Sequence, residues 1–318
     1  FFLIIRRPPR STLFPYTTPF RSGYLILENG LTQDGTLNVA ESASLQVVGG
    51  QLELGADNVF AGGGPIEIPS GSVRLIGSLN HTLRVTGGTV SGSSTVHGTL
   101  DWLGGRLAAG SMEIGPDGAL NLLGDADKLL THWTLNNAGS IRWQDAGRLV
   151  GSFTGFGQSV LITNLPSGLF QIESDADLLL SSPGHGGELM RFSNAGDLVK
   201  LGGSATNSFL GVPTFNSGTI TVSTGALDFP AGLSNEGSIA GSARIELNPP
   251  PLFPPTEPLT LTLHGISGLK YRVEASADLA TWEVIALTNA PARTFQLLDP
   301  GAMGAPVRWY RAPVAPSN

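Results

Sequence analysis

Acidic side chains in two short segments are the first candidates for chemistry. The segment "GDADK" carries Asp125 and Asp127, and "ESDADL" carries Glu173, Asp175 and Asp177. Alternate residues of a strand share a face, so such acids could form a carboxylate pair for glycoside hydrolysis or bind Ca²⁺. Neither segment carries the calcium repeat Gly-Gly-x-Gly-x-Asp or a basic residue placed to abstract a proton. We therefore interpret them as solvated turn acids, with an acidic surface pair at Asp175 and Asp177.

Histidine and cysteine offer no pattern of a metal or nucleophile site. The five histidines are scattered, with no two at the spacing of a metal-binding pair, and the chain has no cysteine. Neither a Gly-x-Ser-x-Gly elbow nor a phosphate-binding glycine loop occurs. The sequence therefore predicts no catalytic residue, no cofactor and no metal site. The histidines are His81, His97, His132, His185 and His264.

Tryptophan could instead provide a stacking platform for sugar rings, because its ring has a flat apolar face and a polar edge. Trp102 and Trp143 occupy the second apolar position of two repeat units, with Trp133 nearby. That position points inward if the register is right, so packing in the core is the favoured interpretation. A glycan-stacking site at Trp102 and Trp143 is the alternative.

The elements that would position these groups are short strands in a repeating pattern. The unit Gly-x-apolar-x-apolar recurs at intervals of 19 to 36 residues, as in "HGTLDW", "DGALNL" and "SGTITV". Apolar and polar residues alternate within each unit, which is typical of a strand buried on one side. Periods in this range indicate a repeat architecture.

Glycine, Asn and Asp at the start of each unit suit a chain that turns after each strand, because these residues most easily adopt left-handed or otherwise restricted backbone angles. Coils stacked about 4.8 Å apart would pair their backbones and line an apolar interior. The sequence thus predicts an all-β chain with a parallel β-solenoid over residues 23–247. A β-sandwich built from hairpins is the competing architecture.

A proline-rich segment divides the chain. "NPPPLFPPTEP" (248–258) has six prolines in eleven residues, which favours a stiff extended linker over a strand. Beyond it, residues 259–318 contain about five short apolar segments separated by Gly, Pro, Asp and Asn. We expect about five short strands there.

Two resemblances support this organisation. "LNNAGSIRW", "RFSNAGDLVKLGG" and "PTFNSGTITVSTGALDF" resemble the repeats of large, exported, adhesin-like bacterial β-solenoid proteins. Residues 259–313 resemble a C-terminal module of secreted proteins from Verrucomicrobia and Planctomycetes, which implies a fibronectin-III-like β-sandwich. The second resemblance rests on Tyr271, Val273, Ser276, Asp278, Leu279, Trp282, Phe295, Asp299, Arg308, Trp309, Tyr310 and Arg311.

The first 22 residues are expected to be foreign to the protein. Residues 4–22 agree at seventeen of nineteen positions with MIRRPPRSTLFPYTTLFRS, the translation of a widely used short-read sequencing adapter. Their order of apolar residues followed by Arg does not fit a signal peptide, and their prolines do not fit a membrane span. We therefore set residues 1–22 aside as an adapter-derived segment, so a signal peptide and an upstream catalytic region would escape observation.

The net charge limits the classes of molecule that the protein is expected to bind. The net charge of the whole chain is -7. Residues 1–22 contain four Arg and no acidic residue, so the net charge of the remaining chain is -11. This acidity disfavours nucleic acid and anionic membranes. We expect a non-catalytic, extracellular or cell-surface repeat protein that acts as a stalk or adhesin-like surface for polysaccharide or other cell-surface components. The alternative is a pectin-lyase-like enzyme fragment or a glycan-binding module; acids clustered with Arg or Lys in one groove would favour the enzyme.

Overall fold

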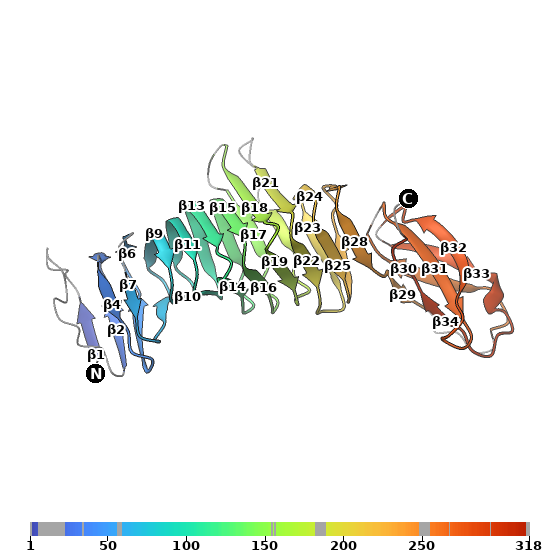
Figure 1. The fold of residues 1–318 in the computed structure, drawn as a ribbon, viewed down its shortest axis with the longest axis horizontal. Coiled ribbons are helices and arrows are strands. Elements are labelled where there is room, and N and C mark those ends of the chain that lie inside the picture. Colours follow the sequence, from blue (N-terminus) through green and yellow to red (C-terminus); the bar gives the residue numbers. More distant parts are fainter. Residues whose placement is uncertain are drawn as a thin grey trace.

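The computed structural model describes residues 2–5, 23–33, 35–55, 59–153, 155, 157–181, 189–247, 255–266, 268–292 and 294–315. Within them the chain is all-β, and its only helical segment is a short 3-10 turn, η1 (Pro300–Ala302). Figure 1 shows a long stack of coils followed by a small C-terminal unit. The predicted fold class is confirmed. The sequence predictions for 6–22, for 248–254 of the linker and for His185 concern residues outside these ranges.

Two parallel sheets form the walls of the solenoid, and each coil contributes strands to both. In the described residues the first sheet has twelve strands, in spatial order β1 (Phe2–Ile5), β2 (Gly23–Leu27), β5 (Ala43–Val47), β8 (Ile66–Ile68), β10 (Thr82–Val85), β12 (Thr99–Trp102), β14 (Ala119–Leu122), β16 (Ser140–Trp143), β19 (Leu169–Ile172), β22 (Asp197–Lys200), β25 (Thr219–Val222) and β28 (Ser238–Gly241).

The second sheet splits into two branches after β15. Its described strands are β3 (Leu31–Gln33), β6 (Gln51–Leu54), β9 (Ser72–Leu79), β11 (Thr89–Val96), β13 (Gly105–Ile114) and β15 (Lys128–Asn137), then one branch of β17 (Leu149–Ser152), β20 (Leu178–Ser181), β23 (Thr206–Leu210) and β26 (Ala226–Asp228), and another of β18 (Ser159–Asn164), β21 (Leu189–Asn194), β24 (Thr214–Asn216) and β27 (Leu233–Asn235). A separate parallel pair, β4 (Thr36–Asn38) and β7 (Val59–Ala61), lies near the N-terminal end.

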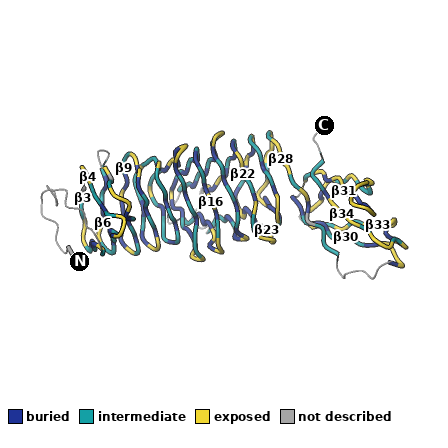
Figure 2. The backbone as a smooth tube through the Cα atoms, turned by 60° about the horizontal axis from the view of Figure 1, so that its bottom comes forward, coloured by how far each residue is buried: buried dark blue, intermediate teal, exposed yellow. Residues whose placement is uncertain are grey.

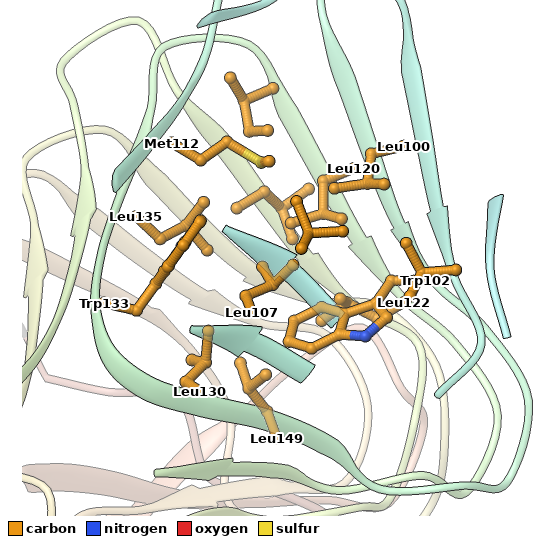
Figure 3. Close-up of a cluster of buried hydrophobic side chains, with 14 of the residues drawn as sticks. Leu100, Trp102, Leu107, Met112, Leu120, Leu122, Leu130, Trp133, Leu135 and Leu149 are labelled. Carbon is orange, nitrogen blue, oxygen red and sulfur yellow. The ribbon is translucent and has the colours of Figure 1, made fainter. Parts of the chain in front are cut away.

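Inward apolar ladders hold the coils together. Leu100 of β12 pairs with Leu83 on one side and with Leu120 on the other, and Leu120 pairs in turn with Ile141. All four side chains are fully buried, while the next residue along each strand faces outward. Figure 2 shows this alternation of buried and exposed residues along the stack, and Figure 3 shows leucines from successive coils meeting in one interior.

The repeat glycines serve close packing rather than unusual backbone angles. Nine glycines open the repeat units, and only Gly35 of these has a positive φ in the structure. The others are Gly71, Gly98, Gly118, Gly139, Gly168, Gly196, Gly218 and Gly237. At Gly139, Gly196 and Gly218 an added Cβ would lie under 3.0 Å from backbone oxygens of the preceding coil. Of the predicted left-handed or otherwise restricted angles, the left-handed ones are therefore wrong for most of these positions: the glycines allow successive corners to lie directly on top of one another.

A buried asparagine ladder runs along the C-terminal half of the solenoid. The side-chain amide of Asn137 donates to Asn164 Oδ1 at 2.7 Å, and Asn164 donates likewise to Asn194. The ladder continues through Asn216 to Asn235, at 2.7 and 2.6 Å. The amides also donate to backbone carbonyls near the same corner, so each amide holds a turn and joins two coils.

The C-terminal unit is a pair of packed antiparallel sheets. One contains β29 (Arg244–Glu246), β30 (Leu259–His264) and β33 (Thr294–Asp299); the other contains β32 (Glu283–Asn289), β31 (Lys270–Ser276) and β34 (Trp309–Arg311). Leu261, Leu263 and Val273 are fully buried in their shared core. The sequence placed residues 244–246 in the solenoid, but β29 pairs with β30, so the second core begins before the proline-rich segment.

The last coil and the C-terminal unit are joined by backbone hydrogen bonds. The Val314 N–H donates to the Gly241 carbonyl at 3.0 Å, and the Ala243 N–H donates to the Ala312 carbonyl at 2.8 Å. Ile266, from the C-terminal unit, also packs into the core of the solenoid. The end of the stack is therefore in direct contact with the unit that follows it.

Candidate functional site

The predicted acidic pair, Asp175 and Asp177, binds the backbone of the next coil. Asp175 accepts hydrogen bonds from the N–H groups of Ser204 and Ala205, at 3.2 and 3.0 Å. Asp177 accepts one from the Ser208 N–H at 2.7 Å. The two residues lie at a corner of the coil, and their carboxylates replace hydrogen bonds that the turning backbone would otherwise lack.

The acids of the preceding coils do the same at the same corner. Asp125 accepts from the Ala146 N–H at 3.3 Å, and Asp127 accepts from the Arg148 N–H at 3.2 Å. The guanidinium of Arg148 also pairs with Asp127, with 2.6 Å between Nη2 and Oδ2. The sequence thus identified the right acids as turn residues, but they are bound to the next coil rather than simply solvated.

Two lysines are buried at this corner. Lys200 Nζ donates to the Ser174 and Gly202 carbonyls at 3.1 and 3.0 Å and lies 3.3 Å from Asp175 Oδ1. Lys128 Nζ donates to the Gly124 carbonyl at 2.6 Å. Burial lowers the pKa of both ammonium groups, and the neighbouring carboxylates oppose that shift. Because both side chains are fully buried, they support the turns and are not accessible to a substrate.

Replacing Asp127 by asparagine is expected to reduce stability only when this carboxyl would be ionised. The hydrogen bond from Arg148 holds the pKa of Asp127 below its ordinary value of 3.8. Stabilisation from such a shift is present above 3.8 and is lost as the pH falls through the lowered pKa. We expect a deficit of about 0.5 kcal/mol at pH 7, small because the pair is partly exposed. Urea denaturation of Asp127→Asn and wild type between pH 2 and pH 7 measures the difference in the free energy of unfolding. A deficit that persists unchanged at pH 2 would contradict the stabilising role of the ionised Asp127 carboxylate.

Trp102 and Trp143 lie in the core, and the glycan-stacking alternative for them is wrong. Both side chains are fully buried, and Trp133 is 2% exposed. Trp143 Nε1 donates to the Gly147 carbonyl at 2.9 Å, which ties the indole to the corner. Figure 3 shows Trp102 and Trp133 directed into the same interior as the leucines. No ring face of Trp102 or Trp143 is available to a sugar, because inward-facing positions of a solenoid are closed by the coils above and below.

One open groove lies where the second sheet bulges. It has a volume of about 400 Å³ and includes Ala109, Ser111, His132 and Ser159 in its lining. Ala109 and His132 have φ values of 54° and 47°, an uncommon conformation for residues other than glycine. The bulge that begins between Val90 and Gly92 accounts for this geometry. No carboxylate lines the groove, so His132 has no acid there to form a general-base pair.

Motif residues of the C-terminal unit hold a loop and join its sheets. Asp278 accepts from the Ala280 and Thr281 N–H groups at 2.8 and 2.7 Å, and these bonds hold its pKa far below the ordinary value. Asp299 accepts from Arg308 Nε at 2.6 Å and from the Tyr310 hydroxyl at 2.9 Å. Because Asp299 ends β33 and Tyr310 lies on β34, the second bond links the two sheets. These side chains have structural roles.

Three other motif residues, Trp282, Trp309 and Arg311, lie at the outer face of the sheet β32–β31–β34. The Arg311 guanidinium lies 4.1 Å from the centre of the Trp282 ring, and Trp309 is 49% exposed. Trp309 and Arg311 stand two residues apart on β34, so they share a face. Arg272 pairs there with Glu274 at 3.0 Å, and Arg311 pairs with the same carboxylate at 2.6 Å. Sequence reasoning missed this site, although the resemblance included three of its residues.

Comparison with known proteins adds no functional assignment. No family model, no curated protein and no solved structure significantly matches the chain. Across the described residues, no group of three or more His, Cys, Asp or Glu side chains is arranged to hold a metal ion. The same part of the chain contains no helix with the length and hydropathy needed to cross a bilayer.

Proposed function

We propose that the chain is a non-catalytic repeat protein that acts as a rigid stalk, at the cell surface or outside the cell, and presents an interaction surface. The observation that carries the proposal is the uninterrupted parallel pairing from β2 to β28 in the first sheet. Successive coils are joined there by backbone bonds, by apolar ladders and, from Asn137 onward, by the asparagine ladder. Such a stack resists bending because every coil is bonded to both neighbours.

The corner acids support this function over the enzyme alternative. Arg148, Lys128 and Lys200 do gather with Asp127 and Asp175, as a catalytic groove would require. Their geometry favours a structural role, since the carboxylates accept backbone N–H groups of the next coil and the lysines are fully buried. The resemblance to exported adhesin-like proteins and the absence of cysteine agree with an extracellular site.

Distances between spin labels test the rigidity. The chain has no cysteine, so labels can be attached to Thr82→Cys and Thr219→Cys. These positions lie in one row of the first sheet, six strand steps apart, a separation of about 29 Å at about 4.8 Å per step. We expect a single narrow distance distribution near this value from pulsed electron paramagnetic resonance.

A second pair provides the control. Thr99→Cys with Thr219→Cys removes one step, so the distance should shorten by about 4.8 Å with the same narrow width. Broad distributions, or equal distances for the two pairs, would contradict a rigid stack. The non-catalytic part of the proposal is tested separately with polygalacturonate: release of reducing ends or unsaturated uronides by the purified chain would overturn it.

A further inference from the structure

The outer face of the sheet β32–β31–β34 differs in charge from the rest of the molecule. The whole chain carries a net charge of -7. On this face, the alternation along β31 and β34 places Lys270, Arg272 and Arg311 on one side, with Glu274 as the acid between the two arginines. Glu274 is 4% exposed, whereas both arginine side chains are nearly half exposed. The face therefore has an excess of accessible positive charge.

Aromatic and aliphatic side chains lie between these charges. The Trp282 ring stacks against Arg311. Trp309, two residues before Arg311 on β34, is 49% exposed. Val284 and Leu287 of β32 are exposed as well, and they pair with Glu274 and Arg272 of β31. We call Lys270, Arg272, Trp282, Trp309 and Arg311 the basic–aromatic face.

Contacts within the C-terminal unit hold the arginines and Trp282 of this face in place. Glu274 orients both arginines through ion pairs, and Trp282 Nε1 donates to the Leu279 carbonyl at 3.3 Å, within the loop that Asp278 holds. Ordered side chains lose little entropy when a ligand binds. Trp309 packs in neither core and keeps half of its surface in water, an arrangement typical of interaction sites rather than of structural tryptophans.

We propose that the basic–aromatic face binds an anionic polysaccharide, in which uronate or sulfate groups alternate with sugar rings. This inference rests on the proposed stalk function and names the partner that the stalk would hold. The guanidinium groups are suited to carboxylate or sulfate oxygens, and the Trp309 ring offers a flat apolar surface to the C–H face of a pyranose. An open sheet surface accommodates an extended polymer better than it encloses a small ligand.

Single-stranded nucleic acid would also combine phosphate with stacking rings, but the surroundings disfavour it. Such proteins track the backbone with a basic groove over several nucleotides. Here three cations stand on an open sheet face of an otherwise acidic molecule, so no run of basic side chains follows a phosphate backbone over several nucleotides. Nucleic acid is therefore an outcome that the experiment must distinguish.

Affinity electrophoresis of the purified full chain tests the proposal, with polygalacturonate, alginate, hyaluronan and chondroitin sulfate in the gel. Neutral dextran and oligo(dT) are the comparison polymers. We expect retardation by at least one anionic polysaccharide, weakened about tenfold by Trp309→Ala, because the ring is lost. The matched control is Leu298→Ala, an exposed apolar residue on the other sheet, which should leave the affinity unchanged. Lys270→Gln should weaken binding and flatten its dependence on NaCl.

The outcomes separate this inference from the stalk proposal. No retardation by any of the four polysaccharides, equal affinity of Trp309→Ala and wild type, or tighter binding of oligo(dT) would overturn it. The label distances across the solenoid would be unaffected by such a result, because they measure the spacing of the coils and involve no residue of the basic–aromatic face. Circular dichroism of each variant establishes that a lost affinity does not come from unfolding.

Discussion

Replacing Asn194 by leucine is expected to lower the free energy of unfolding by about 3–5 kcal/mol. Asn194 donates to Asn216 Oδ1 and to the carbonyls of Gly196 and Thr219, and its own Oδ1 accepts from Asn164. Leucine has the same branched arrangement of heavy atoms, but it is bulkier and satisfies none of these groups. Two amide side chains and two carbonyls would be left without this partner at a buried corner, where each unmade hydrogen bond is costly. Urea denaturation followed by circular dichroism measures the change.

Asn235→Leu is the matched control for the ladder. Asn235 is the last described member, is exposed, and accepts from Asn216 at 2.6 Å. Water can replace the lost bonds at this end, so we expect a loss below about 1.5 kcal/mol. Equal losses for the two variants would show that the ladder contributes no more inside the stack than at its end, and would contradict the role assigned to Asn194.

Gly196→Ala is expected to cost about 2–3 kcal/mol, although it adds only a methyl group. Its φ is not in the left-handed region, so backbone strain is not the cause. The new Cβ would lie under 3.0 Å from the carbonyl oxygens of Gly168 and Leu165, which belong to the coil before it. Backbone atoms cannot rotate away as a side chain can, so the two coils must separate at the corner and weaken their hydrogen bonds.

Gly155→Ala provides the comparison for this substitution. Gly155 also lacks a positive φ, and its added Cβ would meet only the Gln158 side chain, at 3.7 Å. We expect a change within about 0.5 kcal/mol in either direction. The measurement is the thermal unfolding midpoint of each variant relative to wild type. A Gly196→Ala protein as stable as Gly155→Ala would contradict the proposed close packing of the coils at this corner.

Local pattern was sufficient to predict the architecture. Leu120 and Leu122 stand on either side of the polar Asn121 after Gly118, and this period of two predicts a half-buried strand without any information about its neighbours. The recurrence of the same unit then implies stacking, since one short strand cannot bury its apolar side alone. The role of the glycines was misjudged, because the distance between successive coils is a property of the stack and does not appear within one repeat.

The asparagines and the corner acids show a second limit of sequence reasoning. Asn164 lies in a segment that contains a turn, where asparagine is common for local reasons, yet its partners Asn137 and Asn194 lie 27 and 30 residues away. Asp175 likewise binds Ser204 and Ala205, 29 and 30 residues further on. Such contacts become predictable only once the register between coils is known.

The candidate site was the least predictable feature. Trp102 and Trp309 are the same residue type, and only the direction of each side chain separates a core position from an exposed one. For Trp102 the alternating pattern supplied that direction. For Trp309 the short segment "RWYR" does not distinguish the inward Tyr310 from its neighbours, and the sheet pairing with β31 was needed to place Arg311 beside Glu274.

The asparagine ladder begins abruptly, and this has a consequence for how such a chain can evolve. In the preceding coil the position that pairs with Asn137 is occupied by Ile114, and Asn137 Oδ1 has no hydrogen-bond partner. The asparagine ladder therefore joins the coils only in the C-terminal half of the stack. Each coil nevertheless contacts only the coils next to it. Gene duplication could therefore change the copy number of units, and with it the reach of the C-terminal module, without redesigning any other part, provided that each new unit keeps its corner glycine.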